Sequence, residues 1–542
     1  MGIVLIAPGL PDAIGFGTFR AYADGAVLIA ILFGLTRVGD PPEVPWLGTW
    51  RSWGLGAVLA TIVFVQAVQA VARYATNDIL PLYDVVLLAR HLYILGVDLY
   101  GGWARVALLG ILLSPFGIWV VASTLFARVE GALTALPLRG AAGLAIAMTA
   151  LGLLTPATGL GRWSTPRIAE SLLASWQLYQ VVEQEIAANP HRELDATRIG
   201  DPPDLTVYVV ESYGKVLADD PEYAEPWSRL VDRVERDLEA AGWRTASGYA
   251  ISPVHSGRSW IADASMLFGL HLAHQTQYEH AIALVDRLPH LPGALAQRGY
   301  TTVLVKPSDR ARPGVALANP FRFDVTVFAE ELGYGGPVIG WGRIPDQYTI
   351  GAVNDELLPQ LEPPLFAFFH LATAHAPWRV QPPLLPRWTM WRALPEDTEP
   401  AKTRSLDSEL AMQMSRFKRR ELVGVKPRTA DETQRANYFA SIRHDLLSIR
   451  RTHAELPERR SVIVVMGDHQ PPLLARDQGA EVPVHVLVSD GTLLDAFLAE
   501  GFTPGLRPRA GTELAHEALY PLLIRAMASS RVARPSLRDS DP

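Results

Sequence analysis

"SVIVVMGDH" (residues 461–469) is the stretch of this sequence that decides the fold. Five consecutive apolar residues, from Val462 to Met466, are followed directly by a glycine, an acid and an imidazole. A continuous run of Val and Ile is typical of a strand that is buried on both faces of a sheet. In open sheets of this kind, ligands bind at the carboxyl ends of the strands. We therefore expect Asp468 and His469 to lie at a functional edge.

Similar apolar runs recur through the C-terminal part of the chain, with helical patterns between them. The expected strands are residues 205–211, 301–307, 365–372, 461–469 and 482–490. This alternation predicts an α/β domain with a mainly parallel central sheet covered by helices on both faces, over residues 201–530. A segment rich in Pro, Trp and charge, at about 380–432, is expected as an insertion that is either loosely packed or a lid over the site.

The N-terminal part of the chain consists of long apolar runs, such as residues 54–72 and 106–127. About 20 apolar residues span a bilayer. We therefore predict a bundle of about five transmembrane helices in residues 1–160. The run at 79–100 carries charges and is either one of these spans or an interfacial helix. Residues 161–200 are predicted to be an amphipathic connecting helix.

Composition excludes several classes of function. The chain of 542 residues contains no cysteine, so disulfides, thiol catalysis and thiolate metal sites are excluded. Its formal net charge is -7 and it has no basic block, so we expect no nucleic-acid partner.

Acids and imidazoles follow three of the expected strands. Glu211 ends the first strand in "VVESYG", His375 follows another in "LATAHAPW", and Asp468 and His469 follow a third. Glu, Asp and His together are a reasonable ligand set for a divalent cation, with Mn²⁺ or Zn²⁺ as the leading candidates and Mg²⁺ as a further one.

Ser259 follows Gly257 and Arg258 and opens an apolar, helix-compatible run. It is therefore expected at a helix N-terminus, where backbone N–H groups favour an anion. An ordinary capping serine and a nucleophile for phosphoryl or sulfuryl transfer both suit this position.

The order of these residues resembles the alkaline phosphatase and sulfatase superfamily, and more narrowly its lipoteichoic acid synthase and membrane phosphoglycerol transferase branch. The resemblance implies about five N-terminal spans in the inner (cytoplasmic) membrane and a catalytic domain on the periplasmic or extracellular side. It also implies that Glu211, Ser259, Asp468 and His469 are metal ligands. Ser259 would be the nucleophile in a place where the family more often has Thr, with Ser256 as the alternative.

Other residues are implied near the substrate. His375 matches a histidine that steadies the leaving group, and Arg258 is expected to hold phosphate oxygens. The segment "GWGRIPDQ" (340–347) is similar to a family segment and points to Trp341, Arg343 and Asp346 as substrate-binding residues.

The function expected from this resemblance is metal-dependent transfer of a phosphoglycerol-type head group through a covalent intermediate on Ser259. The donor would be a phospholipid of the membrane and the acceptor a glycan or another lipid. The alternatives are a phosphoethanolamine transferase, a hydrolase of the same fold such as a phosphodiesterase or phosphatase, and a non-catalytic lipid-binding regulator.

Overall fold

The protein is described by a computed structural model. The described residues are 21–35 except 23, 50–89 except 79 and 82, 93, 103–157, 161–162, single residues between 170 and 194, and 197–529 except 311–317, 381, 399–429 and 512. The chain forms two compact units, Met1–Val182 with His274–Gln277, and Glu183–Ala273 with Tyr278–Pro542.

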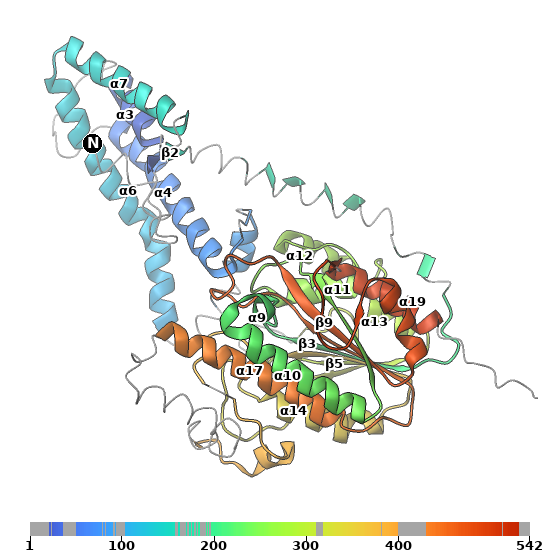
Figure 1. Cartoon of the computed structure of the whole chain (residues 1–542). Helices are drawn as coiled ribbons and strands as arrows, with labels where there is room; N and C mark the ends of the chain where they lie inside the picture. The colour runs from blue at the N-terminus through green and yellow to red at the C-terminus, as the bar shows by residue number, and fades with distance from the viewer. Residues whose placement is uncertain are drawn as a thin grey trace, which may run out of the picture. The chain divides into compact units, whose positions relative to one another are not determined.

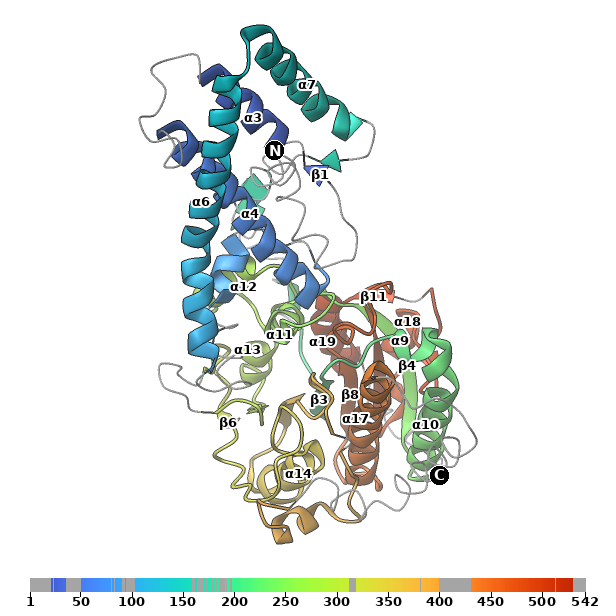
Figure 2. The ribbon, with the colours of Figure 1, turned by 90° about the vertical axis from the view of Figure 1, so that its left-hand side faces the viewer.

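The first unit contains helices and one short strand pair. Its elements are β1 (Ala21–Tyr22), α3 (Asp24–Leu35), α4 (Trp50–Thr76), α6 (Trp103–Ala135), α7 (Leu138–Ala157) and β2 (Gly161–Arg162). Helices α4 and α6 lie side by side (Figure 2), and the indole of Trp119 donates to the carbonyl of Trp53 (3.0 Å). Gly56 permits this approach, because a Cβ there would lie 2.3 Å from the hydroxyl of Ser123.

Two helices of this unit are long and apolar enough to cross a membrane, Trp50–Tyr74 and Arg105–Ala135. Large apolar side chains of the second, including Leu109, Leu112 and Phe116, are exposed, as suits contact with lipid.

The prediction of about five spans is not met within the described residues. Helix α3 is described over only 12 residues, too few for a span. Much of the charged run at 79–100 lies outside the described residues, as does most of the predicted connecting helix at 161–200.

The second unit is built around one sheet. Its strands are β3 (Asp204–Val210), β4 (Arg244–Ile251), β5 (Thr301–Val305), β6 (Val325–Val327), β7 (Leu365–Leu371), β8 (Ser461–Gly467), β9 (Glu481–Val488), β10 (Thr503–Pro504) and β11 (Glu513–Ala515). The strand order is β10-β4-β9-β8-β3-β7-β5-β6, with β11 beside β4. Strands β8, β3, β7, β5 and β6 run parallel, whereas β9 is antiparallel to both β8 and β4.

The sheet is therefore mixed, and the prediction of a mainly parallel sheet was wrong. The chain passes from β8 to β9 through residues 468–480 without a helix. Parallel neighbours need a crossover connection, so this short return makes the two strands antiparallel. Strand β4, "RTASGYAI", was not predicted because its sequence contains no continuous apolar run.

Helices cover both faces of this sheet. Their bounds are α9 (Val216–Asp219), α10 (Pro221–Ala240), α11 (Ser259–Phe268), α12 (Gln275–Ala283), α13 (Leu291–Ala296), α14 (Asp346–Ala352), α17 (Ala430–Thr452), α18 (Asp495–Ala499) and α19 (Leu519–Ser529), with a π-helical turn at Val353–Leu357 and 3-10 turns at Leu358–Gln360, Trp388–Ala393, Gly491–Leu493 and His516–Ala518.

Two apolar cores separate these helices from the sheet. Helices α10, α14 and α17 pack on one face, and α11, α13 and α19 pack on the other (Figure 1). Strand β3 contributes to both cores. Tyr208 and Val210 belong to the core under α10, α14 and α17, and Val207 and Val209 belong to the core under α11, α13 and α19. This alternation is the two-residue period of a strand buried on both faces.

The predicted insertion at about 380–432 is only partly described, because residues 399–429 lie outside the described chain. The part before them is packed. Gln347 of α14 donates to the carbonyl of Leu385 (2.7 Å) and accepts from the indole of Trp391 (3.0 Å). Trp391 is fully buried, so these residues before 399 pack against α14.

A buried chain of hydrogen bonds ties β3, β4 and β9 together behind the strand ends. The indole of Trp227 donates to the Tyr213 hydroxyl (3.1 Å), which lies 2.8 Å from Nε2 of His485. Nδ1 of His485 lies 2.8 Å from the Ser247 hydroxyl, which donates to the carbonyl of Gly505 (2.7 Å). Burial lowers the pKa of His485 to about 3, so this histidine is neutral at ordinary pH.

This histidine predicts sensitivity to acid. Because the folded pKa of His485 lies below its usual unfolded value, the unfolded chain binds the extra proton. Stability is therefore full above about pH 6.5 and falls as the pH drops toward 3, by about 1.4 kcal/mol per pH unit. In denaturant titrations between pH 7 and 5, His485→Gln should show a shallower loss of unfolding free energy than the wild type. An identical slope would contradict this.

Candidate active site

Two neighbouring parallel strands bring the first acids together. Val210 at the end of β3 is in register with Gly467 at the end of β8, so Glu211 and Asp468 emerge side by side. Gly467 has no room for a side chain, since a Cβ would lie 2.0 Å from the carbonyl oxygen of Tyr213. The glycine therefore permits the close approach of the two strand ends.

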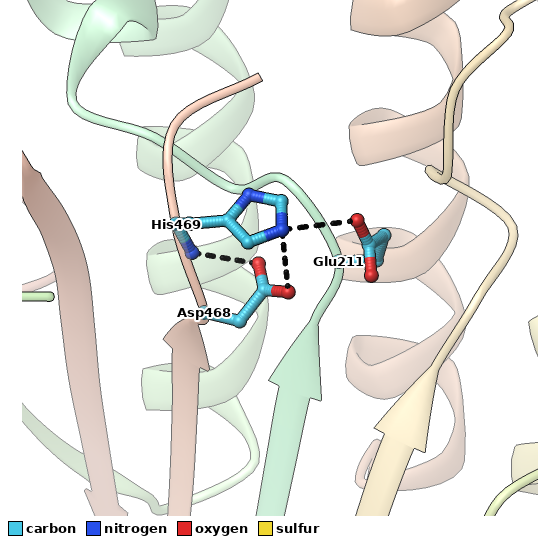
Figure 3. Close-up of side chains that lie close together, drawn as sticks. All are labelled: Glu211, Asp468 and His469. Carbon is cyan, nitrogen blue, oxygen red and sulfur yellow. Dashed lines mark hydrogen bonds and ion pairs between the residues drawn. The ribbon is translucent and has the colours of Figure 1, made fainter. Parts of the chain in front are cut away.

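Glu211, Asp468 and His469 form one buried cluster (Figure 3). Nε2 of His469 lies 3.4 Å from Oε1 of Glu211 and 3.2 Å from Oδ2 of Asp468. One ligand atom of each residue lies within 4.8 Å of the others.

The hydrogen bonds around this cluster leave acceptor atoms facing one another. Oδ1 of Asp468 accepts the N–H groups of Ser212 and His469 (both 2.7 Å). Oδ2 of Asp468 is buried and faces Nε2 of His469 (3.2 Å) rather than a backbone N–H group. Nδ1 of His469 faces the carbonyl of Gln470 (2.9 Å), so it carries the proton and leaves Nε2 as an acceptor. Two carboxylates and an imidazole acceptor in this arrangement fit a divalent cation.

Ser259 is the fourth member of this arrangement. It begins helix α11, its hydroxyl donates to Oε2 of Glu211 (2.9 Å), and it lies 3.2 Å from Nε2 of His469. The backbone before it turns sharply, with positive φ angles at Gly257 (64°) and Arg258 (61°). The turn directs the start of α11 toward the strand ends.

The pKa values of Asp468 and Glu211 are shifted in opposite directions. Burial, together with the charge of Glu211, raises the pKa of Asp468 to about 7. Burial would also raise the pKa of Glu211, but the neighbouring imidazoles of His375, His469 and His370 hold it well below its usual range. Glu211 is thus ionised at neutral pH, and a cation would compete with a proton for Asp468.

His370, which the sequence analysis missed, links this cluster to helix α11. Its Nε2 lies 3.5 Å from Oε2 of Glu211, and its Nδ1 lies 2.8 Å from Oδ2 of Asp263. Burial would lower the pKa of His370, but Asp263 raises it to about 10. Lys306 lies 3.8 Å from the same carboxylate. The sequence did hold a signal for this pair: His370 and Asp263 each lie inside an apolar run, where a buried polar group without a partner is costly.

The residues predicted near the substrate differ in burial and in their contacts. The ring of His375 stacks on Trp341, with 3.8 Å between ring centroids, and burial lowers the pKa of His375 although Glu211 opposes this. Arg343 is exposed. Asp346 is fully buried and its carboxylate accepts hydrogen bonds from backbone N–H groups, so its expected role in binding substrate stays a prediction.

Arg258 lies inside the fold rather than at an open surface. Its side chain is buried, and Nη1 donates to the carbonyl of Ala273 (3.1 Å). Its expected role in holding phosphate oxygens therefore stays a prediction. Ser256, the alternative nucleophile, is also buried.

No protein-family model matches the chain, and no curated protein matches it in sequence. Among solved structures, it is similar to the integral membrane lipooligosaccharide phosphoethanolamine transferase A of Neisseria meningitidis (12% identity, 93% of this chain and 95% of that one, TM-score 0.46). It is also similar to a phosphoglycerol transferase of Streptococcus pyogenes in complex with sn-glycerol-1-phosphate (11%, 65% and 82%, 0.37). A third is a lipoteichoic acid synthase of Listeria monocytogenes (13%, 54% and 69%, 0.33).

The identities to these three structures lie between 11% and 13%, and all three TM-scores are below 0.5. At such identities and TM-scores they do not define the activity, the substrate or the metal of this chain.

The cluster predicts that the purified protein binds about one divalent cation per chain and that Asp468→Asn removes most of it. The reason is that the substitution takes away the negative charge that faces Glu211 and His469. Elemental analysis after dialysis measures the metal content. Binding should weaken as the pH falls below about 7, where a proton occupies Asp468.

Asp477→Asn, in the connection between β8 and β9, is the matched control and should keep the metal. Equal metal content in wild type and Asp468→Asn would show that the cluster is not the binding site.

Proposed function

We propose that this chain is a membrane-anchored, metal-dependent phosphotransferase of the alkaline phosphatase and sulfatase type, with Ser259 as its nucleophile. The observation that carries the proposal is the position of the Ser259 hydroxyl. It starts a helix, donates to Glu211 and adjoins His469. An ordinary capping serine would instead accept a hydrogen bond from its own helix.

Glu211, Asp468, His469 and the Ser259 hydroxyl would hold the cation. A divalent cation bound there would lower the pKa of the Ser259 hydroxyl and balance negative charge on a phosphate group. The first N–H groups of α11 have no partner within the helix and would hold phosphate oxygens. The site thus combines a nucleophile with an anion-binding helix start.

The chemistry would proceed in two halves. Oγ of Ser259 forms a bond to phosphorus while the phosphorus–oxygen bond to diacylglycerol breaks, and the proton that Ser259 gives up ends on the diacylglycerol oxygen. His375 would stabilise the leaving oxygen. The oxygen of an acceptor hydroxyl, or of water, then attacks the phosphoserine as the Oγ–phosphorus bond breaks, and the acceptor's proton passes to Oγ, which regenerates Ser259.

The N-terminal helices would keep the catalytic unit beside a lipid donor. The exposed apolar side chains of α6 support this membrane anchoring, because they can be buried in lipid. We also propose, as the resemblance implies, that residues 201–530 form a catalytic domain on the outer side of the inner membrane. Among donors we favour a phosphoglycerol head group, with phosphoethanolamine as the alternative and a glycan or lipid as acceptor.

A head-group release assay on mixed micelles tests the nucleophile. Ser259→Ala should lower turnover of phosphatidylglycerol or phosphatidylethanolamine at least about 10³-fold, because the covalent step is lost. Ser259→Thr should keep a large part of the activity, since a hydroxyl remains. The matched control is Ser256→Ala, which removes a nearby hydroxyl. Full activity in Ser259→Ala, or loss in Ser256→Ala alone, would assign the role to Ser256.

Adding an acceptor to the assay distinguishes a transferase from a hydrolase. A transferase should release diacylglycerol faster when a glycolipid with free hydroxyls is added, and it should place the head group on that glycolipid. Mass spectrometry of the products measures this. Free glycerol phosphate or phosphoethanolamine as the sole product, at an unchanged rate, would favour the hydrolase.

A further inference from the structure

Asp346 is bound to the loop that carries His375. This His375 loop comprises residues 372–378, directly after β7. The Asp346 carboxylate accepts the N–H of Ala372 (3.1 Å to Oδ1 and 3.0 Å to Oδ2) and the N–H of Thr373 (2.6 Å to Oδ2). In return, the N–H of Asp346 donates to the Thr373 hydroxyl (2.8 Å). One buried side chain thus fixes the first two residues of the loop.

The residues before Asp346 contact the same loop at two more points. Trp341 stacks on the ring of His375. Gly342 packs against Ala372 so closely that a Cβ there would lie 2.8 Å from the Ala372 Cβ. The segment 341–346 therefore contacts the loop both at its start and at His375.

A second buried carboxyl faces the first. Asp445 of α17 is fully buried, like Asp346, and its Oδ1 lies 3.0 Å from Nδ1 of His444. With both carboxyls ionised, Oδ2 of Asp445 has no hydrogen-bond partner in the described chain. The side chains of Asp445 and Asp346 are hydrogen-bond partners of each other, and two carboxyls can form such a bond only when one of them carries a proton. The other titratable group that bears on the pair is His444.

We propose that Asp346 and Asp445 share one proton and together act as positioning residues that lock the His375 loop in its place beside Glu211. Their role in catalysis rests on the proposed function, whereas the lock itself does not. Two adjacent buried carboxyls resist double ionisation, so one proton is retained well above the usual range for aspartate. Loss of that proton would set two buried negative charges against each other and loosen the loop.

The direction of the pH effect follows from the same groups. Burial, with the charge of Asp445, raises the pKa of Asp346 to about 8, and burial raises the pKa of Asp445 well above its usual value. The folded chain therefore holds a proton that the unfolded chain has lost above about pH 4. The shared proton is present below about pH 8 and is lost above it, so the loop should loosen on the alkaline side.

Hydrogen exchange of the full-length protein in detergent tests the lock. The exchange rate of peptides that cover residues 372–378 is measured from pH 6 to 9.5. Protection at each pH is obtained by comparing this rate with the intrinsic amide exchange rate. Wild-type protection should fall at least about tenfold above pH 8. In Asp445→Asn the amide donates to Asp346 without titrating, so protection should stay level. Asp346→Ala removes the acceptor and should abolish protection at every pH.

An exposed acid gives the matched control, and Asp397→Asn should behave as the wild type. If protection in Asp445→Asn falls above pH 8 as much as in the wild type, the two carboxyls do not share a proton. If Asp346→Ala keeps full protection, Asp346 does not lock the loop. If Asp346→Ala does not fold, the comparison of wild type with Asp445→Asn decides alone.

Activity is a separate readout. If the proposed function holds, Asp445→Asn should extend the alkaline limb of the kcat profile with an unchanged KM. Because hydrogen exchange needs no substrate, failure of the proposed function would leave the exchange result intact.

Discussion

Three buried acceptor atoms, on Glu211, Asp468 and His469, face one another at the ends of two adjacent strands, and the rest of the site depends on this arrangement. Uncompensated buried charge costs several kcal/mol per ion. The fold nevertheless places the carboxylates together, with Oδ2 of Asp468 facing Nε2 of His469. A cation bound between these groups would balance their charge, and the Ser259 hydroxyl, 2.9 Å from Oε2 of Glu211, would adjoin it.

Both faces of the sheet support the cluster. On one face, Asp263 of α11 orients His370 toward Glu211, so the helix that presents Ser259 also positions one of its neighbours. On the other face, α14 and α17 supply the carboxyls that border the His375 loop. Close backbone contacts at Gly467 and Gly342 leave no space for side chains. Small residues thus set the spacing, and charged residues set the orientation of the functional groups.

The parts of the fold that follow local patterns could be predicted from sequence. The runs that became β3, β5, β7, β8 and β9 were predicted as strands, and the α/β class followed from their alternation with helices. The direction of β9 was not predictable from its apolar run, because a strand buried on both faces has the same pattern in either direction. Strand β4 is polar and small, and only its pairing with β9 makes it a strand.

For the site, strand ends and a helix start indicated Glu211, Ser259, Asp468 and His469, and the structure places these four side chains together. Burial was harder to foresee. Asp346 was assigned to substrate because the segment 340–347 is similar to a family segment, and that similarity did not show that its carboxylate binds the backbone of another loop. His370 was missed because its partners, Glu211 and Asp263, come from distant parts of the chain.

The most direct test of the central claim is the intact mass of the detergent-solubilised protein after incubation with Mn²⁺ and a phospholipid. Phosphatidylglycerol and phosphatidylethanolamine would be used in turn, beside Ser259→Ala. The account predicts a head-group phosphate adduct on the wild type, mapped to Ser259 by fragmentation, and none on the variant. Head-group turnover with no adduct on Ser259 under rapid acid quench, or an equal adduct on Ser259→Ala, would contradict it.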